Sequence, residues 1–286
     1  QFARADSLLG SALGIFQKLG DPAYTSVPLS NMGWLAQKKG DSVNALKYFQ
    51  ESLRQSEAAQ DSGSSAIILY SIGSTYRRSK EYASAEDYLR RSLALERALG
   101  RKGKEANCLT ALANTFREQG DTAQARIRYA EAAALYNAHH DHAGAGLVEE
   151  NIGDMYVEDS PLRALEHYRT ALAHYDSIES KEDKAYVLKD MGTAQTALKR
   201  FPEAQASFAE GSALATEMGS MELVMDYELA LSRLAAALGD APSTLQHYER
   251  YTALKDSLQG EDTQRELARL RTAFDTERKE KDNAVF

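Results

Sequence analysis

The sequence predicts an all-α fold, a solenoid of stacked helix pairs, and two observations support this prediction. Apolar and small residues recur every three to four positions along almost the whole chain, which is typical of amphipathic helices. The same pattern returns at a step of about 40 residues. A helix pair of this length cannot bury its own apolar face, so a fixed step predicts that neighbouring pairs stack and share a continuous core.

The clearest copy of the repeat spans residues 72–95. It predicts a helix, a tight turn at residues 79–81 and a second helix, in which Ala85, Leu89 and Ser92 share one face. Small residues recur at one position of the first helix. They are Gly33, Gly73, Ala113, Gly153 and Gly192. Since a larger side chain would hold two helix backbones apart, these positions predict a close approach of the paired helices.

On these residues the chain resembles the tetratricopeptide repeat family, whose second helix carries an Ala, aromatic, small pattern. The resemblance implies a right-handed α-solenoid with a concave groove lined by the first helices. It divides the chain into the second helix of a truncated repeat (1–20), six repeats (21–259) and a charged C-terminal helix (260–286). Because the chain starts inside a repeat, we expect it to be a piece of a longer protein.

The repeat unit is longer than the ~34 residues usual in that family. We place the extra length in the links between repeats, as at residues 100–103 and 180–183, where polar residues cluster. The link at residues 60–65 contains serines, which we expect to cap the helix that follows.

Composition and charge exclude several classes of protein. The net charge of −8 argues against a general nucleic-acid surface, because phosphate binding needs clustered Lys and Arg. Cys108 is the single cysteine, so no intrachain disulfide forms, and we expect it to be a small buried hydrophobe. No apolar run reaches the roughly 18 residues of a membrane span, so we predict none within this stretch of chain.

Motifs of catalysis and cofactor binding are absent from the sequence. The chain has no phosphate-binding glycine loop, no CxxC zinc pair, no GxSxG elbow and no HExxH helix. The link at His139, His140, Asp141 and His142 collects metal-ligating residue types, but adjacent ligands on one short turn seldom converge on an ion. We therefore predict a non-catalytic chain with no catalytic residue, no cofactor and no metal.

The resemblance also implies which residues face the groove, namely those on the first helices opposite the contacts with the second helices. Such residues follow a four-then-three spacing along one helical stripe, which also includes Gln37, Thr110 and Val157. The residues that we select as the partner-binding surface are Trp34, Tyr70, Ser74, Arg77, Asn114, Arg117, Glu150, Asp154, Lys189 and Arg233.

Charge alternates along this stripe, basic around Arg77 and Arg117 and acidic around Glu150 and Asp154. Such a pattern suits an extended peptide or a protein segment held by complementary charge. Asn114 follows the small residue, where members of the family that grip a peptide often place Asn. Because its equivalents in the other repeats are different residue types, we expect no paired asparagine clamp.

Half of the residues from 261 onward are charged, seven acidic and six basic, which predicts a solvated helix supported by i,i+4 ion pairs. Leu267, Leu270 and Phe274 form a short apolar seam on this helix. We expect the seam to dock on the last repeat or to pair with a second copy in a coiled coil. Since three seam positions are few, the homodimer would be weak.

The tail over residues 251–258 and 273–281 resembles the juncture in bacterial membrane-anchored signalling proteins where a periplasmic tetratricopeptide sensor region leads to a transmembrane segment. Outputs in that group are diguanylate cyclases, histidine kinases and helix-turn-helix regulators, and none of their motifs lies in this chain. The resemblance implies a periplasmic sensor module that binds a peptide or protein and transmits through Leu267, Leu270 and Phe274. The alternative is a cytoplasmic regulator or scaffold of the same fold, controlled by a peptide or protein partner.

Overall fold

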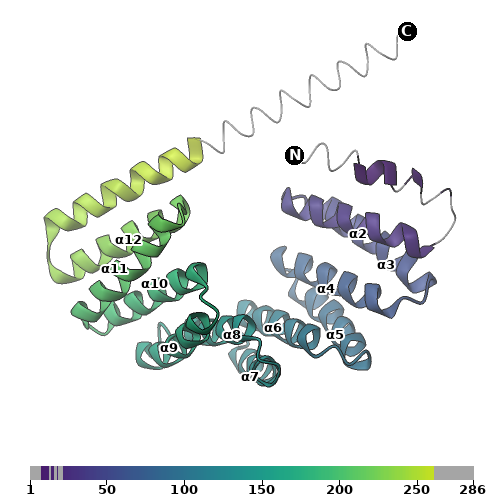
Figure 1. Ribbon diagram of the computed structural model, residues 1–286, viewed down its shortest axis with the longest axis horizontal. Helices are drawn as coiled ribbons and strands as arrows, with labels where there is room; N and C mark the ends of the chain where they lie inside the picture. The colour runs from purple at the N-terminus through teal and green to yellow at the C-terminus, as the bar shows by residue number, and fades with distance from the viewer. Residues whose placement is uncertain (1–7, 13, 16–17, 19–21, 261–286) are drawn as a thin grey trace, which may run out of the picture. The chain divides into compact units, whose positions relative to one another are not determined.

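The computed structural model describes residues 8–12, 14, 15, 18 and 22–260, and all regular structure within these ranges is helical. The helices labelled in Figure 1 are α2 (Pro22–Lys38), α3 (Ser42–Ala58), α4 (Ser62–Arg78), α5 (Tyr82–Ala98), α6 (Lys102–Gln119), α7 (Thr122–Ala138), α8 (His142–Asp154), α9 (Pro161–Ser177), α10 (Lys181–Ala197), α11 (Phe201–Glu217) and α12 (Met221–Leu238). A further helix covers residues 241–260. None of the described helices is both long and apolar enough to cross a membrane.

The chain divides into two compact units, Gln1–Met155 and Tyr156–Phe286. In the first unit α2 packs on α3, α4 on α5 and α6 on α7, and in the second α10 packs on both α9 and α11. The first helices also touch one another, α2 with α4 and α4 with α6, and Figure 1 shows these three side by side. Each unit is therefore a stack of helix hairpins, which confirms the predicted α-solenoid of helix pairs.

The turns between helices recur every 20 residues, because most helices are 17 or 18 residues long and each turn has the same short form. Each of these turns except the one between α8 and α9 contains one residue with positive φ. These residues are Gly40, Gln60, Lys80, Gly100, Gly120 and His140, and after a shift of one position Glu179, Lys199, Gly219 and Gly239. A left-handed residue of this kind is the common way to end a helix and redirect the chain.

The expectation that the extra repeat length lies in the links is wrong. Arg101 and Ser180 are the N-cap residues of α6 and α10, and the residues that follow them form the first turns of these helices. The repeat is long because its helices are long. Polar residues mark these segments because the first turn of such a helix is largely exposed, which sequence alone does not distinguish from a loop.

Helix starts are capped mainly by aspartate. The carboxylates of Asp41, Asp61, Asp121 and Asp141 each accept a hydrogen bond from the main-chain N–H three residues later, at 2.9–3.0 Å. The prediction of serine caps in the link at 60–65 is therefore wrong, because Asp61 takes that role at α4. A carboxylate also interacts favourably with the positive end of the helix dipole. Hydrogen bonds from Ser64 lower the pKa of Asp61.

Close approach at the small residue of the first helix is confirmed for α2, α4 and α10. A Cβ added to Gly73 would lie 2.7 Å from Leu89 Cγ and 3.1 Å from the carbonyl oxygen of Ala85. Gly33 and Gly192 stand in the same relation to a phenylalanine ring of the second helix, at 2.5 and 2.4 Å. In these three hairpins the core therefore leaves no room for a side chain at the small position.

A second recurrent contact is a side-chain hydrogen bond to one main-chain carbonyl of the first helices α2, α4 and α10. Ser52 Oγ donates to the carbonyl of Ser26 at 2.7 Å, and Ser92 Oγ donates to that of Ala66 at 2.8 Å. In the second unit the corresponding residue is Gly211, which has no side chain. There the Tyr227 hydroxyl, contributed by α12, donates to the carbonyl of Ala185. Different residues thus donate a hydrogen bond to the equivalent main-chain carbonyl of the first helix.

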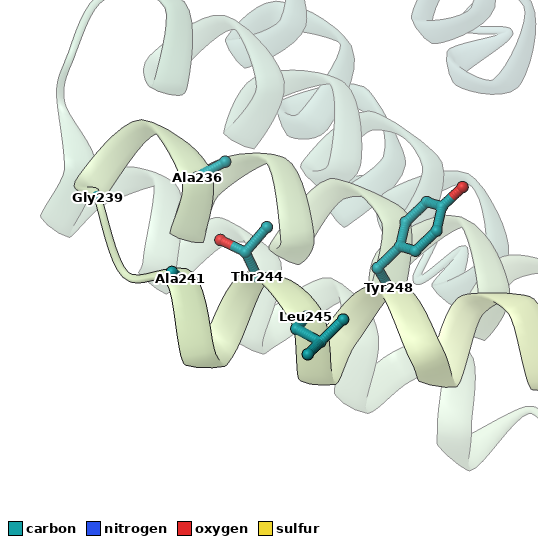
Figure 2. Close-up of a pocket in the computed structure, with 6 residues that line it drawn as sticks. All are labelled: Ala236, Gly239, Ala241, Thr244, Leu245 and Tyr248. Atoms are coloured by element: carbon teal, nitrogen blue, oxygen red, sulfur yellow. The ribbon is translucent and has the colours of Figure 1, made fainter.

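The helix over residues 241–260 is packed more loosely than the other second helices, since none of its residues is fully buried. The Ser232 hydroxyl donates to the Thr244 carbonyl at 2.9 Å and so holds it against α12. Figure 2 shows Leu245 and Tyr248, which help to line a shallow hollow beside the C-terminal end of α12. Their side chains are 59% and 50% exposed. Phe208, at the repeat position of Tyr248, is 1% exposed. The last repeat is therefore degenerate in packing as well as in sequence.

Replacing Gly73 by Ala is expected to lower the free energy of unfolding by about 1–3 kcal/mol, because the new methyl group overpacks against Leu89 and the Ala85 carbonyl. The matched control is Gly103→Ala in α6, where the added Cβ meets no atom within 4 Å. This control is expected to raise stability by about 0.4–1 kcal/mol. Urea denaturation measures both, and a Gly73→Ala protein as stable as the wild type would contradict the close-approach explanation.

Candidate functional site

The predicted partner-binding residues lie on first helices, as expected, but they fall into both units. Lys189 on α10 and Arg233 on α12 belong to the second unit. The others share the first unit and are Trp34 on α2, Tyr70, Ser74 and Arg77 on α4, Asn114 and Arg117 on α6, and Glu150 and Asp154 on α8. We call the surface of α2, α4, α6 and α8 that carries these residues the first-helix face of the first unit.

Side chains on this face bond from one first helix to the next. The Trp34 indole N–H donates to Ser71 Oγ at 2.9 Å, and Gln37 Nε2 donates to Thr75 Oγ1 at 3.0 Å. Trp34 also meets the Phe49 ring edge-on, with ring centroids 6.4 Å apart, yet it remains 39% exposed. Its ring is therefore held by packing while part of it stays open to a partner.

The basic residues of the face are paired with acids on the next first helix. Arg77 forms an ion pair with Glu118, and Arg117 Nη1 lies 3.2 Å from Asp154 Oδ2. Lys189 repeats the arrangement in the second unit, 3.3 Å from Asp226. The two arginine side chains are 25% and 30% exposed, so a ligand can still reach them. Arg77 Nε is buried and has no hydrogen-bond partner among the described residues.

Two asparagines of α6 accept hydrogen bonds from buried tyrosines of α7. The Tyr129 hydroxyl donates to Asn114 Oδ1, and the Tyr136 hydroxyl donates to Asn107 Oδ1 at 2.7 Å. Burial raises the pKa of Tyr129 to about 12 and also raises that of Tyr136, so both hydroxyls stay protonated at neutral pH. Sequence reasoning missed Asn107, because it compared Asn114 with other repeats and not with its own helix.

A small hollow of about 60 Å³ opens between α4 and α6, and it is lined by Ile67, Tyr70, Glu96, Lys104, Asn107 and Cys108. A space of this size holds a few water molecules or a small side chain. Cys108 is 2% exposed, which confirms the prediction of a buried residue. Burial raises the pKa of its thiol to about 11, so it is a weak nucleophile at neutral pH.

A network of ion pairs next to this hollow joins α5 to the start of α6. Arg101 bonds both oxygens of Glu96, at 2.7 and 3.0 Å, and Glu96 is only 2% exposed. Glu105 accepts from Arg97 and Lys102, each at 2.8 Å. Burial raises the pKa of Glu105, but the hydrogen bonds from Lys102 and Arg97 outweigh it and the net shift is downward. These carboxylates are bound by cations, so we assign them a structural role.

Several predicted features lie elsewhere or outside the described residues. Val157 does not continue the stripe of Glu150 and Asp154, because α8 ends at Asp154 and residues 155–159 form a turn. The next helix begins with Pro161, which limits how far a preceding helix can extend. The charged helix with Leu267, Leu270 and Phe274 lies outside the described residues. Within the described ranges no three His, Cys, Asp or Glu side chains converge as a metal site would require.

Comparison with known proteins identifies the repeat. The family profile of the tetratricopeptide repeat matches residues 64–138. These residues cover most of α4 and all of α5, α6 and α7, and so include the α4 and α6 part of the first-helix face. A comparison with curated protein sequences found no match.

Solved structures share the fold at low sequence identity. BtubC (BKLC) from P. vanneervenii aligns with a TM-score of 0.67 at 20% identity, over 77% of this chain and 93% of that one. Aspartyl phosphate phosphatase F from Bacillus subtilis gives 0.74 at 15%, over 86% of this chain and 64% of that one. The Rap conjugation gene regulator of plasmid pLS20, in complex with the Phr* peptide, gives 0.59 at 13%, over 82% and 74%. At these identities the likeness shows the fold alone.

The downward pKa shift of Glu105 predicts a pH dependence of stability. A carboxyl group with a lowered folded pKa contributes stability above its unfolded pKa, near 4.5, and this contribution is lost as pH falls through the folded value. Glu105→Gln is therefore expected to cost about 1–3 kcal/mol at pH 7, and the cost should shrink steadily below pH ~4.5.

The matched control for this prediction is Glu57→Gln. Glu57 is 55% exposed and lies 3.7 Å from Arg91, so its loss is expected to change stability by less than about 1 kcal/mol at any pH. Urea denaturation at pH 3.5, 4.5 and 7 measures both variants. A cost of Glu105→Gln that does not vary with pH would show that its charge is not the stabilising feature.

Proposed function

Because the chain is built from tetratricopeptide repeats, we propose that it is a non-catalytic binding module whose partner, a peptide or an extended protein segment, lies on the first-helix face of the first unit. The observation that supports this most directly is the alignment of polar side chains across α4, α6 and α8. Asn114, Arg117 and Asp154 all lie on this aligned surface. A ligand of several residues would meet a donor or an acceptor on each helix it crosses.

The ion pairs of this face define what kind of partner it suits. Arg77 and Arg117 are partly exposed and paired with carboxylates, so an incoming acidic group would share or replace Glu118 and Asp154 as their partner. Exchange of this kind gives selectivity for complementary charge and makes binding sensitive to salt. The buried, unpartnered Nε of Arg77 supports the same proposal, since a bound acceptor or a water molecule would satisfy it.

The proposal also concerns the kind of protein to which this chain belongs and the compartment in which it works. We retain the sensor region of a bacterial membrane-anchored signalling protein, located in the periplasm, as the first candidate, supported by the tail sequence at 251–258 and 273–281. The second candidate is a cytoplasmic regulator controlled by a peptide. It is supported by the likeness in fold to a gene regulator that binds the Phr* peptide. In both, output domains would lie elsewhere in the protein, and Leu267, Leu270 and Phe274 would transmit the bound state.

A library of random octapeptides displayed on phage, panned against the whole chain, tests the binding function. We expect enrichment of acidic sequences, and Trp34 fluorescence provides the affinity of the most enriched synthetic octapeptide. Trp34 is the single tryptophan and lies on the proposed surface, so its emission should change on binding.

Arg117→Gln is expected to weaken binding of this octapeptide about tenfold or more, since it removes a charged hydrogen bond to the ligand. Stability should change by less than about 1 kcal/mol, because the ion pair is partly exposed. Lys181→Gln, which removes an ion pair with Glu217 at 2.6 Å in the second unit, is the control and should leave the affinity unchanged. Failure to enrich any octapeptide, or equal losses in both variants, would refute the placement of the ligand.

A further inference from the structure

We infer that Tyr129 and Tyr136 are positioning residues, which turn the side-chain amides of Asn114 and Asn107 so that α6 offers two fixed hydrogen-bond donors to the oxygen atoms of a bound peptide. This inference rests on the proposed function, because it assigns the grip on the peptide backbone to a specific pair of residues. The expectation that no asparagine clamp is formed by equivalent positions of successive repeats stands beside it. The pair lies along one helix and does not repeat from helix to helix.

The two tyrosine–asparagine contacts are the same arrangement made twice. Asn107 and Asn114 are seven residues apart on α6, and Tyr129 and Tyr136 are seven residues apart on the antiparallel α7. Seven residues are two helical turns, so both asparagines lie on one side of α6, about 10.5 Å apart along the axis. The two tyrosines are 0% and 4% exposed, so their hydroxyls reach α6 from within the core.

The direction of each hydrogen bond fixes the orientation of each amide. Both hydroxyls are protonated at neutral pH, and the hydroxyl proton of Tyr129 has no other acceptor among the described residues. The Tyr136 hydroxyl also lies 3.5 Å from Thr110 Oγ1, but its contact with Asn107 Oδ1 is much shorter, at 2.7 Å. Donation to Oδ1 therefore satisfies the buried hydroxyl, whereas the flipped amide would leave its proton unbonded. In this orientation Nδ2 of Asn107 and Nδ2 of Asn114 donate to no described residue, and neither atom is buried.

Packing does not require the hydroxyl of Tyr129. The residues that occupy the position of Tyr129 in other repeats include Phe49, Leu89 and Phe208, which are buried equally well at 0%, 0% and 1% exposure. A phenylalanine would therefore fill the same space in the third repeat. The hydroxyl is the part of Tyr129 that the core does not need, and its bond to Asn114 is what distinguishes this repeat.

The surroundings of the two amides favour an oxygen-rich segment. Lys104 lies one turn before Asn107 and forms no salt bridge in the described part of the chain, and Arg117 lies one turn after Asn114. This side of α6 therefore carries donors at both ends. A polyproline II segment rises about 9.3 Å in three residues and then presents a carbonyl on the same side again. Such a segment, with an acidic residue near Lys104, would run along α6 and meet the spacing of the two amides to within about 1.2 Å, while the residues on either side of it would extend toward α4 and α8.

Nuclear magnetic resonance tests the orientation without any ligand. The Asn114 side-chain NH₂ group is expected to be rigid in the wild type, with an order parameter near ~0.8, and to fall below ~0.6 in Tyr129→Phe while Asn107 stays rigid. Tyr136→Phe should show the reverse. Tyr168→Phe removes the hydroxyl at the same repeat position in the second unit, where the residue is 1% exposed, and should alter neither amide. Rigid amides in all three variants would overturn the positioning role.

Affinity for the enriched octapeptide tests whether the oriented amides bind the peptide. Tyr129→Phe is expected to weaken binding about 3- to 10-fold, equivalent to the loss of one well-placed hydrogen bond, and Tyr168→Phe should leave it unchanged. Since Tyr129 acts through Asn114, adding Tyr129→Phe to Asn114→Ala should cause no further loss. An independent, additive loss in the double variant would overturn the proposal and indicate a structural effect.

These outcomes separate the inference from the proposed function. If the octapeptide binds and Arg117→Gln weakens it while Tyr129→Phe and Asn107→Ala do not, the binding surface stands and the amide pair is refuted. If binding is indifferent to Arg117→Gln as well, the proposed surface itself is refuted. In that case mobile amides in Tyr129→Phe would still establish that the tyrosine orients Asn114, and rigid ones would overturn that too.

Discussion

The rest of the structure depends on the close contact between the small residue of each first helix and the large residue of its partner. At Gly33, Gly73 and Gly192 the second helix comes so near that a Cβ would overlap a Phe or Leu side chain. A contact of this kind fixes how far the two helices slide and rotate against each other. Since the hairpins repeat at a nearly constant number of residues, equivalent positions of successive first helices lie next to one another.

This alignment explains the bonds that run along the first-helix face. Trp34 reaches Ser71, and Arg117 reaches Asp154, in both cases 37 residues further along the chain. Lys189 and Asp226 show the same separation in the second unit. Most charge on the face is thereby paired within the protein. A partner must compete with these internal bonds. The face therefore selects a partner that places several groups correctly at once, and the affinity depends on how many internal bonds the partner replaces.

Departures from the repeat mark the specialised parts of the molecule. In the third repeat, two tyrosines reach across the hairpin to asparagines that have no counterpart in the neighbouring first helices. In the last repeat Ser232 stands at the small position, and Tyr248 lies half exposed where other repeats bury a large side chain. The same framework thus supports a donor pair at one place and an open apolar surface at another.

The sequence by itself determined the helical period, the hairpin pairing and the helices that carry the candidate site, because these follow from spacing and residue size. It identified Gly73 as a point of close helix approach and Cys108 as buried. Only the tertiary structure decided that Arg77 and Arg117 are paired, that Asp61 caps α4 and that Tyr136 donates to Asn107. The physical reason is that each of these depends on a hydrogen bond, whose partner is selected by the position and direction of single atoms. Periodicity specifies which face a residue occupies and says nothing of where its donor points.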